Sequence, residues 1–157
     1  MPARIDPDSF GFVVNDVARL IRVEVDRLIA GAGIGLTPGE ARALSHAARA
    51  GSVRQNILAE RMGVEAMTMC GYIDRLEARG LVHRTVDPTD RRAKLVHLTD
   101  AADEVLARLS SVGLESRRKA SADLSAEEWA VLQDLLKRVR ATLSENRCAA
   151  AEKDDAA

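Results

Sequence analysis

Positive charge is concentrated in one short stretch of this 157-residue chain. The chain as a whole has a formal net charge of −1, but residues 52–99 carry 8 Lys and Arg against 6 Asp and Glu. Four of these cations lie close together in sequence: Arg84, Arg91, Arg92 and Lys94. Guanidinium and ammonium groups neutralise phosphates, so this local excess indicates a polyanion such as nucleic acid, although the net charge alone argues against a strongly basic binder.

Residues for other kinds of chemistry are missing. We find no nucleophile beside a base, no phosphate-cradling glycine loop and no catalytic pair of carboxylates, so neither an enzyme nor a resident cofactor is expected. His46, His83 and His97 have no ligand-spaced cluster of Cys or carboxylates beside them, which disfavours a metal site and leaves zinc sensing as a minor alternative. Cys70 and Cys148 make no disulfide framework. No apolar run is long enough to span a membrane, so we expect a cytoplasmic protein.

Two helices and a hairpin are expected to position the cations. Apolar residues at helical spacing predict a short helix capped by Ser52, and a second helix from about Ala66 to Ala78. Their apolar stripes are Ile57, Leu58 and Met62 in the first helix and Met69, Ile73 and Leu76 in the second. Gly63 fits the turn between the helices, and Gly80 fits a left-handed C-terminal cap.

The period then changes to that of β-strands. Residues 81–86 and 94–98 mix β-branched and charged residues in near alternation, as half-buried strands do. Residues 87–90, Asp-Pro-Thr-Asp, have the composition of a turn, because Pro fixes φ and Asp bonds back to nearby amides. His83 and His97 fall on the two opposing strands and can approach each other.

A helix-turn-helix followed by a hairpin reads DNA with one helix in the major groove and a wing on the backbone or minor groove. The run DRLEARGLVHR, followed by DPTDRRAKLVHLT, resembles the winged helix-turn-helix of the MarR family of bacterial transcription regulators, and is closest to its SlyA-like members. The resemblance covers roughly Asp16 to Leu143. It implies a homodimer with interlocked terminal helices on a pseudo-palindromic operator.

The resemblance also suggests which residues contact DNA. In the family pattern, an Asp-x-Arg at the wing tip places the Arg in the minor groove and uses the Asp to hold the loop, which assigns these roles to Arg92 and Asp90. Thr68 matches a polar contact residue of the family, whereas Gly71 replaces an Arg that reads bases in SlyA-like relatives. Specificity then relies on Thr68, Met67, the helix N-terminus and DNA shape, or affinity is weak. The full set of DNA-binding candidates is Arg54, Gln55, Met67, Thr68, Cys70, Gly71, Arg75, Arg84, Asp90, Arg91, Arg92 and Lys94.

Several candidates have a second interpretation. Arg54, Gln55 and Arg75 suit phosphate contacts, which fix register without reading sequence, but equally suit solvated surface positions. Cys70 is either a small packed residue or a redox-active thiol whose modification would clash with DNA. Tyr72 either contacts DNA or packs against the wing or a neighbouring helix.

The regions outside this stretch predict further helices. Residues 1–8 are expected to form a flexible arm, residues 9–35 an N-terminal dimerisation helix, and residues 36–99 the winged helix-turn-helix lobe. Residues 100–146 are expected to form C-terminal dimerisation helices, and residues 147–157 a disordered tail. Capping boxes begin two of the helices, at Thr37-Pro38-Gly39-Glu40 and at Ser125-Ala126-Glu127-Glu128. The predicted fold is therefore mainly α with a small β-hairpin wing.

The terminal helices carry apolar stripes broader than a monomeric winged helix needs, which favours a two-fold homodimer over a monomeric helical bundle. The predicted function is a DNA-binding transcriptional regulator, a ligand-responsive repressor or antirepressor-type activator. The resemblance implies a small, often phenolic or aromatic, anion as effector. Residues that can be imagined lining its cleft are Arg19, Leu20, Arg22 and His46, but no ligand site is assigned. The alternative is a ligand- or redox-sensing helical interaction protein with weak or lost DNA binding.

Overall fold

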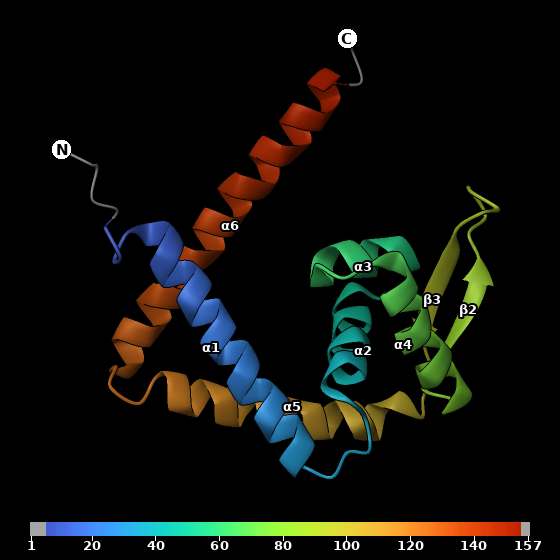
Figure 1. The fold of residues 1–157 in the computed structure, drawn as a ribbon, viewed down its shortest axis with the longest axis horizontal. Helices are drawn as coiled ribbons and strands as arrows, with labels where there is room; N and C mark the ends of the chain where they lie inside the picture. Colours follow the sequence, from blue (N-terminus) through green and yellow to red (C-terminus); the bar gives the residue numbers. More distant parts are fainter. Residues whose placement is uncertain (1–5, 155–157) are drawn as a thin grey trace. The chain divides into compact units, whose positions relative to one another are not determined.

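The computed structural model describes residues 6–154, with side chains described up to residue 146. The elements follow the order α1 (Phe10–Gly31), α2 (Pro38–Ala50), β1 (Val53–Arg54), α3 (Gln55–Met62), α4 (Ala66–Ala78), β2 (Val82–Val86), β3 (Lys94–Leu98), α5 (Ala102–Ala120) and α6 (Ala126–Asp154) (Figure 1). The expectation of a mainly α fold with a β wing is confirmed. The chain divides into two compact units, Met1–Arg117 and Arg118–Ala157.

The wing belongs to a three-stranded antiparallel sheet with the order β1-β3-β2. The hairpin strands pair from Val82 opposite Leu98 to Val86 opposite Lys94. The extra strand, β1, pairs Val53 with Val96 on the other edge of β3. A two-residue strand is too short to show alternation, so it escaped the sequence analysis. It also occupies the residues after Ser52, and α3 therefore has Arg54 as its N-cap instead of the expected Ser52.

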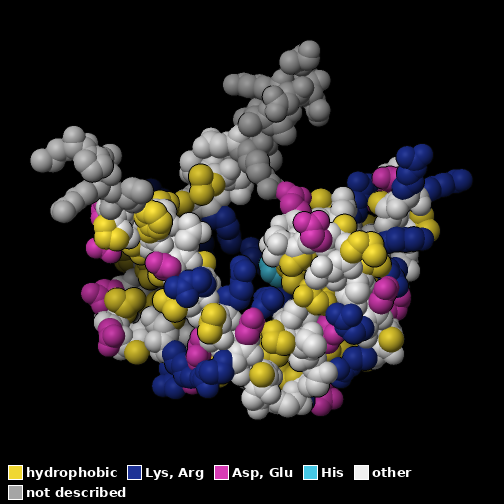
Figure 2. Space-filling model, viewed as in Figure 1, with side chains coloured by type: hydrophobic (Ala, Val, Ile, Leu, Met, Phe, Trp, Pro, Cys, Tyr) yellow, Lys and Arg dark blue, Asp and Glu magenta, His cyan; other side chains and the backbone are white. Residues whose placement is uncertain are grey.

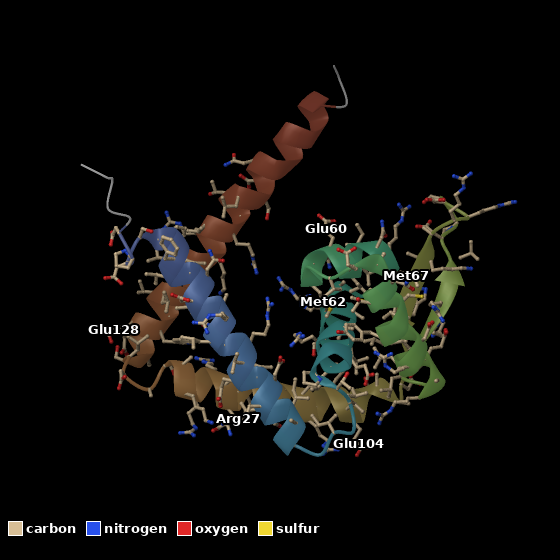
Figure 3. The ribbon with its side chains drawn as sticks, viewed as in Figure 1. Arg27, Glu60, Met62, Met67, Glu104 and Glu128 are labelled. Atoms are coloured by element: carbon tan, nitrogen blue, oxygen red, sulfur yellow. The ribbon has the colours of Figure 1, made fainter. Side chains whose placement is uncertain are left out.

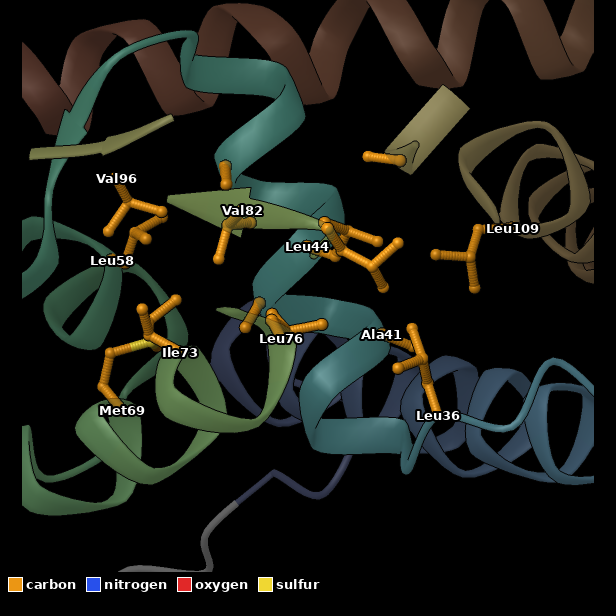
Figure 4. Close-up of a cluster of buried hydrophobic side chains, with 14 of the residues drawn as sticks. Leu36, Ala41, Leu44, Leu58, Met69, Ile73, Leu76, Val82, Val96 and Leu109 are labelled. Carbon is orange, nitrogen blue, oxygen red and sulfur yellow. The ribbon is translucent and has the colours of Figure 1, made fainter. Parts of the chain in front are cut away.

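The core of the first unit lies between α2, α3, α4 and the sheet. Its largest fully buried side chains are Leu44, Leu58, Met69, Ile73, Leu76, Val82 and Val96 (Figure 4). The predicted stripe of α4 is thus confirmed in full. The stripe of α3 is confirmed in part, because Leu58 is buried while Ile57 and Met62 are half-buried.

The capping boxes of α2 and α6 and the glycines that end α3 and α4 are as predicted. The Thr37 hydroxyl accepts a hydrogen bond of 3.3 Å from the Glu40 amide, and the Glu40 carboxylate accepts one of 3.0 Å from the Thr37 amide. These two bonds complete the capping box of α2. Gly63 and Gly80 end α3 and α4 with φ angles of +62° and +69°, in the left-handed region that favours glycine. In the second unit, Ser125 and Glu128 form the reciprocal bonds of the other capping box.

The terminal helices carry exposed apolar faces. On α1 these are Phe10, Phe12, Val13, Val14, Val17, Leu20, Ile21 and Val23, and on α6 they are Val131, Leu132, Leu135, Leu136, Val139 and Leu143. α6 ends at Asp154, beyond the boundary expected at residue 146, because its alanine-rich end is a good helix former without a helix breaker. The remainder of the expected tail and residues 1–5 of the expected arm lie outside the described residues. In the part of the chain described here, no helix has the length and apolar character needed to cross a bilayer.

Tyr72 packs against the start of α2, which agrees with one of its two predicted roles. A Cβ added at the buried Gly39 would meet the Tyr72 ring, with the Cε1 atom only 2.7 Å away. The first turn of α2 and α4 are therefore in direct contact, and only glycine leaves room for the ring between them.

We predict that Gly39→Ala destabilises the protein by about 1–3 kcal/mol, because the added methyl group overpacks the Tyr72 ring. Helix propensity alone predicts the opposite sign, since alanine is favoured over glycine in a helix. Urea unfolding followed by circular dichroism measures the difference. Gly113→Ala in α5 is the matched control, because its Cβ would meet nothing within 4 Å. Equal stability of the Gly39→Ala variant and the parent would contradict this packing.

Candidate nucleic-acid interface

The first turn of α4 has no side-chain cap. α4 begins at Ala66, and the preceding Glu65 makes no side-chain capping bond. Met67 is 81% exposed, and Thr68 beside it is also exposed. Figure 3 marks Met67 on α4, near the wing. The first amides of a helix have no partners within the helix and carry partial positive charge, so an uncapped end favours a phosphate or another anion.

Cys70 and Gly71, two of the predicted DNA-binding residues on α4, are half-buried. The Cys70 Sγ lies 3.8 Å from the Asp74 Oδ2, one turn further along α4. A Cβ at Gly71 would lie 3.3 Å from the Nη1 of Arg75, so the glycine leaves space for that guanidinium. Gly71 has no side chain to read a base, and the Cys70 thiol already faces a carboxylate. Of the predicted site residues on the first turn of α4, Met67 and Thr68 are both exposed.

A buried carboxylate organises the base of the wing. Asp87 is 5% exposed, and its Oδ2 accepts a hydrogen bond of 2.6 Å from the Nε of Arg54. Its Oδ1 accepts both the amide and the hydroxyl of Thr89, each at 2.7 Å. The Nη2 of Arg54 also donates to the Thr89 hydroxyl at 3.0 Å. These bonds, those from Thr89 above all, lower the pKa of Asp87 from 3.8 to about 2.

The wing carries three exposed cations, Arg91, Arg92 and Lys94. Asp90 accepts the backbone amide of Arg92 at 3.0 Å, which is the loop-holding role expected from the family pattern. The Arg91, Arg92 and Lys94 side chains are exposed and make no hydrogen bond or ion pair with any residue that the structure describes. Figure 2 shows dark blue side chains projecting from the wing.

A hollow of about 320 Å³ lies between α3, α4 and the wing. Its walls come from the first turn of α3, the first residue of α4 and the wing loop, namely Gln55, Asn56, Ala66, Asp90, Arg92, Ala93 and Lys94. Four of the predicted site residues, Gln55, Asp90, Arg92 and Lys94, thus surround one concave surface next to the uncapped end of α4. A strand of phosphates fits this combination of shape and charge.

Three of the predicted arginines are engaged inside the protein. Arg54 holds the wing base, as described above. The Nη2 of Arg84 lies 2.8 Å from Asp74 and 2.5 Å from Glu77, and the hydrogen bond with Glu77 is the main reason that the pKa of Arg84 is raised. The Nε of Arg75 donates to Glu40. DNA contact by these three arginines stays a prediction, and in this structure each one attaches the wing or α4 to its neighbour.

The acidic partners of Arg54 and Arg75 were not predicted from the sequence. Asp87 was expected only to bond nearby amides within the turn, yet its guanidinium partner lies 33 residues away. Glu40 was assigned only to a capping box, and its contact with Arg75 spans 35 residues. Both carboxylates stand within local motifs that already explain them, so nothing in one sequence pointed to a distant arginine.

The two wing histidines lie side by side, as their positions on opposing strands suggested. His83 pairs with His97 in the β2-β3 register, and their ring centroids are 5.0 Å apart with planes inclined by 17°. The hydroxyl of Thr85 lies 2.8 Å from the Nε2 of His97. Over residues 6–146, His, Cys, Asp and Glu form no group of three or more that could hold a metal ion.

Comparisons with known proteins agree with this geometry. The model of the MarR family matches residues 36–94, from the segment before α2 to the first residue of β3. A putative transcriptional regulatory protein for the hcr operon of Thauera aromatica is 34% identical over 105 residues, which are 67% of this chain and 63% of that protein. The match therefore spans less than two thirds of that relative's length.

Solved structures extend the similarity over most of the chain. A probable transcriptional regulator from Pseudomonas aeruginosa is 36% identical, with a TM-score of 0.61 over 84% of this chain and 97% of the other. CouR from Rhodococcus jostii RHA1, solved with p-coumaroyl-CoA bound, is 25% identical, with a TM-score of 0.66 over 87% of this chain and 95% of the other. The fold is therefore shared well beyond the residues that the family model matches.

Removing the Asp87 charge tests the wing base. The folded state lowers the pKa of this carboxyl to about 2, so its charge stabilises the fold above pH 3.8 and this contribution is lost as the pH falls towards 2. We expect Asp87→Asn to be less stable than the parent at pH 7, and the difference to shrink between pH 5 and pH 2. Urea unfolding at a series of pH values measures it.

Asp90→Asn is the control for this experiment, because asparagine keeps an oxygen that accepts the Arg92 amide. If the difference in stability between Asp87→Asn and the parent stays constant over this pH range, the charge of Asp87 does not stabilise the fold.

Proposed function

The chain belongs to the MarR family, and on this premise we propose that it is a transcriptional regulator that binds a pseudo-palindromic operator as a homodimer. The observation that carries this proposal is the hollow between the uncapped end of α4 and the wing, which is lined by the exposed cations Arg92 and Lys94, with the exposed Arg91 next to Arg92 in the wing loop. A helix end that attracts phosphate and an exposed pair of guanidinium groups suit a major groove and its adjacent minor groove.

In this proposal the interface divides its tasks. Met67 and Thr68 face the base edges, where a methionine can contact a thymine methyl group and a threonine can bond to several bases. Arg92 enters the minor groove and Arg91 meets phosphate. Arg54 supports the wing from below, since its guanidinium is already bonded to Asp87 and Thr89.

A homodimer is supported by the exposed apolar face of α1. Val17 and Leu20 are 49% and 56% exposed, and apolar side chains continue along the helix on either side of them. Contiguous apolar surface on this scale marks an interaction site. In a two-fold dimer the second copy covers this face, and two recognition helices then fall roughly 34–36 Å apart, one turn of DNA.

We propose that this regulator responds to an aromatic or phenolic anion, acting as a repressor that the anion releases. CouR, the relative solved with p-coumaroyl-CoA, supports this class of effector. The first unit has a hollow of about 500 Å³ between the end of α1 and α5, where Leu28 and Val112 offer apolar surface and Arg27 and Arg108 offer positive charge. Titrating p-coumaroyl-CoA and free aromatic acids into the operator complex identifies the effector by DNA release.

The rival function is a ligand- or redox-sensing interaction protein without DNA binding. The bare position at Gly71 and the thiol of Cys70 on the same turn favour it. A protein of this kind binds DNA weakly and without a steep dependence on salt, so the DNA titration below separates the two functions.

We expect the protein to bind its upstream DNA tightly, with log affinity falling linearly with log salt concentration. Arg91→Ala should reduce the slope of that line by about 1.8, because the homodimer loses two phosphate contacts worth about 0.9 each. Arg92→Ala should weaken operator binding, because the minor groove loses its guanidinium group. Fluorescence anisotropy at several salt concentrations measures the slope. Arg22→Ala, which removes an exposed cation of α1, is the control and should leave the slope unchanged. Absent or salt-insensitive binding by a folded parent would reject the proposed function.

We expect Val17→Asp to convert the dimer into a monomer, because a charge at the apolar interface would lose its hydration without gaining a partner. Operator affinity should fall with it, since one half-site is then bound at a time. Sedimentation velocity gives the oligomeric state, and circular dichroism shows that the helices remain. Asn15→Asp places the same charge about 200° around the helix and should stay dimeric. A dimeric Val17→Asp variant would place the interface elsewhere.

A further inference from the structure

One side of α4 is attached to the segment that leads from α1 into α2. Tyr72, Arg75 and Arg79 lie at i, i+3 and i+7 and so share a helix face. Tyr72 packs on Gly39, Arg75 bonds to Glu40, and the Nη1 of Arg79 donates to the backbone oxygen of Gly35. We call these three pairs the α4 anchor.

The central pair of the anchor has a buried acidic member. Glu40 is 4% exposed, and its two carboxylate oxygens have separate partners, the Thr37 amide and the Nε of Arg75. Burial raises the pKa of Glu40, but the hydrogen bonds from Thr37 and Arg75 outweigh that effect and leave the pKa below its usual value. Loss of the arginine would leave a buried charge with less compensation.

Arg75 is held on a second side as well. Its guanidinium carbon lies 5.5 Å from the centroid of the Tyr72 ring, within the range of a cation–π contact. Its Nη1 also occupies the space that a side chain at position 71 would need. The Arg75 guanidinium thus contacts α2, its own helix α4 and the Tyr72 ring, although the Arg75 side chain is 56% exposed.

We propose that Arg75 is a positioning residue, which together with Glu40 sets the orientation of the recognition helix on the lobe, and that it does not contact DNA phosphate. The inference rests on the proposed function. Apolar packing of Met69, Ile73 and Leu76 fixes how deeply α4 sits, but such contacts are non-directional. The directional bonds of the anchor fix its rotation, on which the aim of Met67 and Thr68 depends.

The salt dependence of binding separates positioning from phosphate contact. We expect Arg75→Gln to lower operator affinity by about tenfold, comparable to the loss of one base contact, with much less effect on random DNA. The salt slope should stay at the parent value, because no phosphate contact is lost. Arg91→Gln, the same substitution at an exposed cation of the wing, should reduce the slope by about 1.8, since the homodimer loses two phosphate contacts. A slope for Arg75→Gln that falls as far as that of Arg91→Gln would overturn the proposal.

Glu40→Gln gives opposite results under the two explanations. Glutamine preserves the capping box, but it removes the charge that holds Arg75. A positioning pair predicts weaker operator binding, and a double variant with Arg75→Gln no weaker than either single variant, because the two residues act through one contact. If Glu40 merely withholds Arg75 from DNA, its loss frees a cation for phosphate and operator binding becomes tighter, which would overturn the proposal.

A measurement without DNA tests the anchor itself. Tyr72 is the only tyrosine in the chain, so labelling with fluorotyrosine gives one fluorine resonance in the full-length protein. Arg75→Gln and Glu40→Gln should both shift this resonance, while Arg91→Gln should leave it in place. An unchanged resonance in the first two variants would overturn the contact. If Arg75→Gln fails to fold by circular dichroism, Arg75→Lys, which keeps the charge but loses the planar donor group, replaces it and should be intermediate.

Failure of this inference is distinguishable from failure of the proposed function. A parent protein without salt-steep operator binding rejects the function, and the positioning role with it. A parent that binds normally, with an Arg75→Gln variant of reduced slope, rejects the positioning role alone.

Discussion

Complete burial of Met69, Ile73 and Leu76 is the constraint on which the DNA-facing surface depends. A helix that reads DNA has to keep its outer side free of protein contacts, so its attachment must come from its inner side and its ends. Here the apolar seam sets the depth of α4 and the left-handed cap at Gly80 sets its end. The N-terminal end lacks a side-chain cap and remains open, which costs local stability but leaves its amides available.

The predicted DNA-binding arginines are of two kinds, those paired with a carboxylate and those exposed on the wing. Arg54, Arg75 and Arg84 each have an acidic partner, and they connect elements of the lobe. Arg91 and Arg92 have none among the described residues and stand exposed on the wing. This division explains how a chain with a net charge of −1 can present a basic surface. Acidic residues neutralise Arg54, Arg75 and Arg84, and the exposed cations of the wing keep their charge.

Short-range patterns predicted most of the fold. The stripe of α4, the capping box at Thr37 and the hairpin all follow from residues within a few positions of one another, and all are present. What escaped prediction joins distant segments or is too short to have a period. The Arg54–Asp87 and Arg75–Glu40 pairs are of the first kind and β1 is of the second. For this reason the sequence located the candidate interface, but it could not tell an arginine facing solvent from one bonded inside the lobe.

The close approach of Gly71 and the Arg75 side chain limits which residues can replace the glycine during evolution. Position 71 lies on the second turn of the recognition helix, where a new long side chain would be the shortest evolutionary route to a different operator preference. In this lobe its Cβ would press to within 3.3 Å of the Arg75 guanidinium, which Glu40 holds in place. A lineage that acquires a base-reading residue at position 71 must therefore also accommodate Arg75. The two positions are expected to change together, because a side chain at position 71 requires the Arg75 guanidinium to move by a few tenths of an ångström against its bond to Glu40.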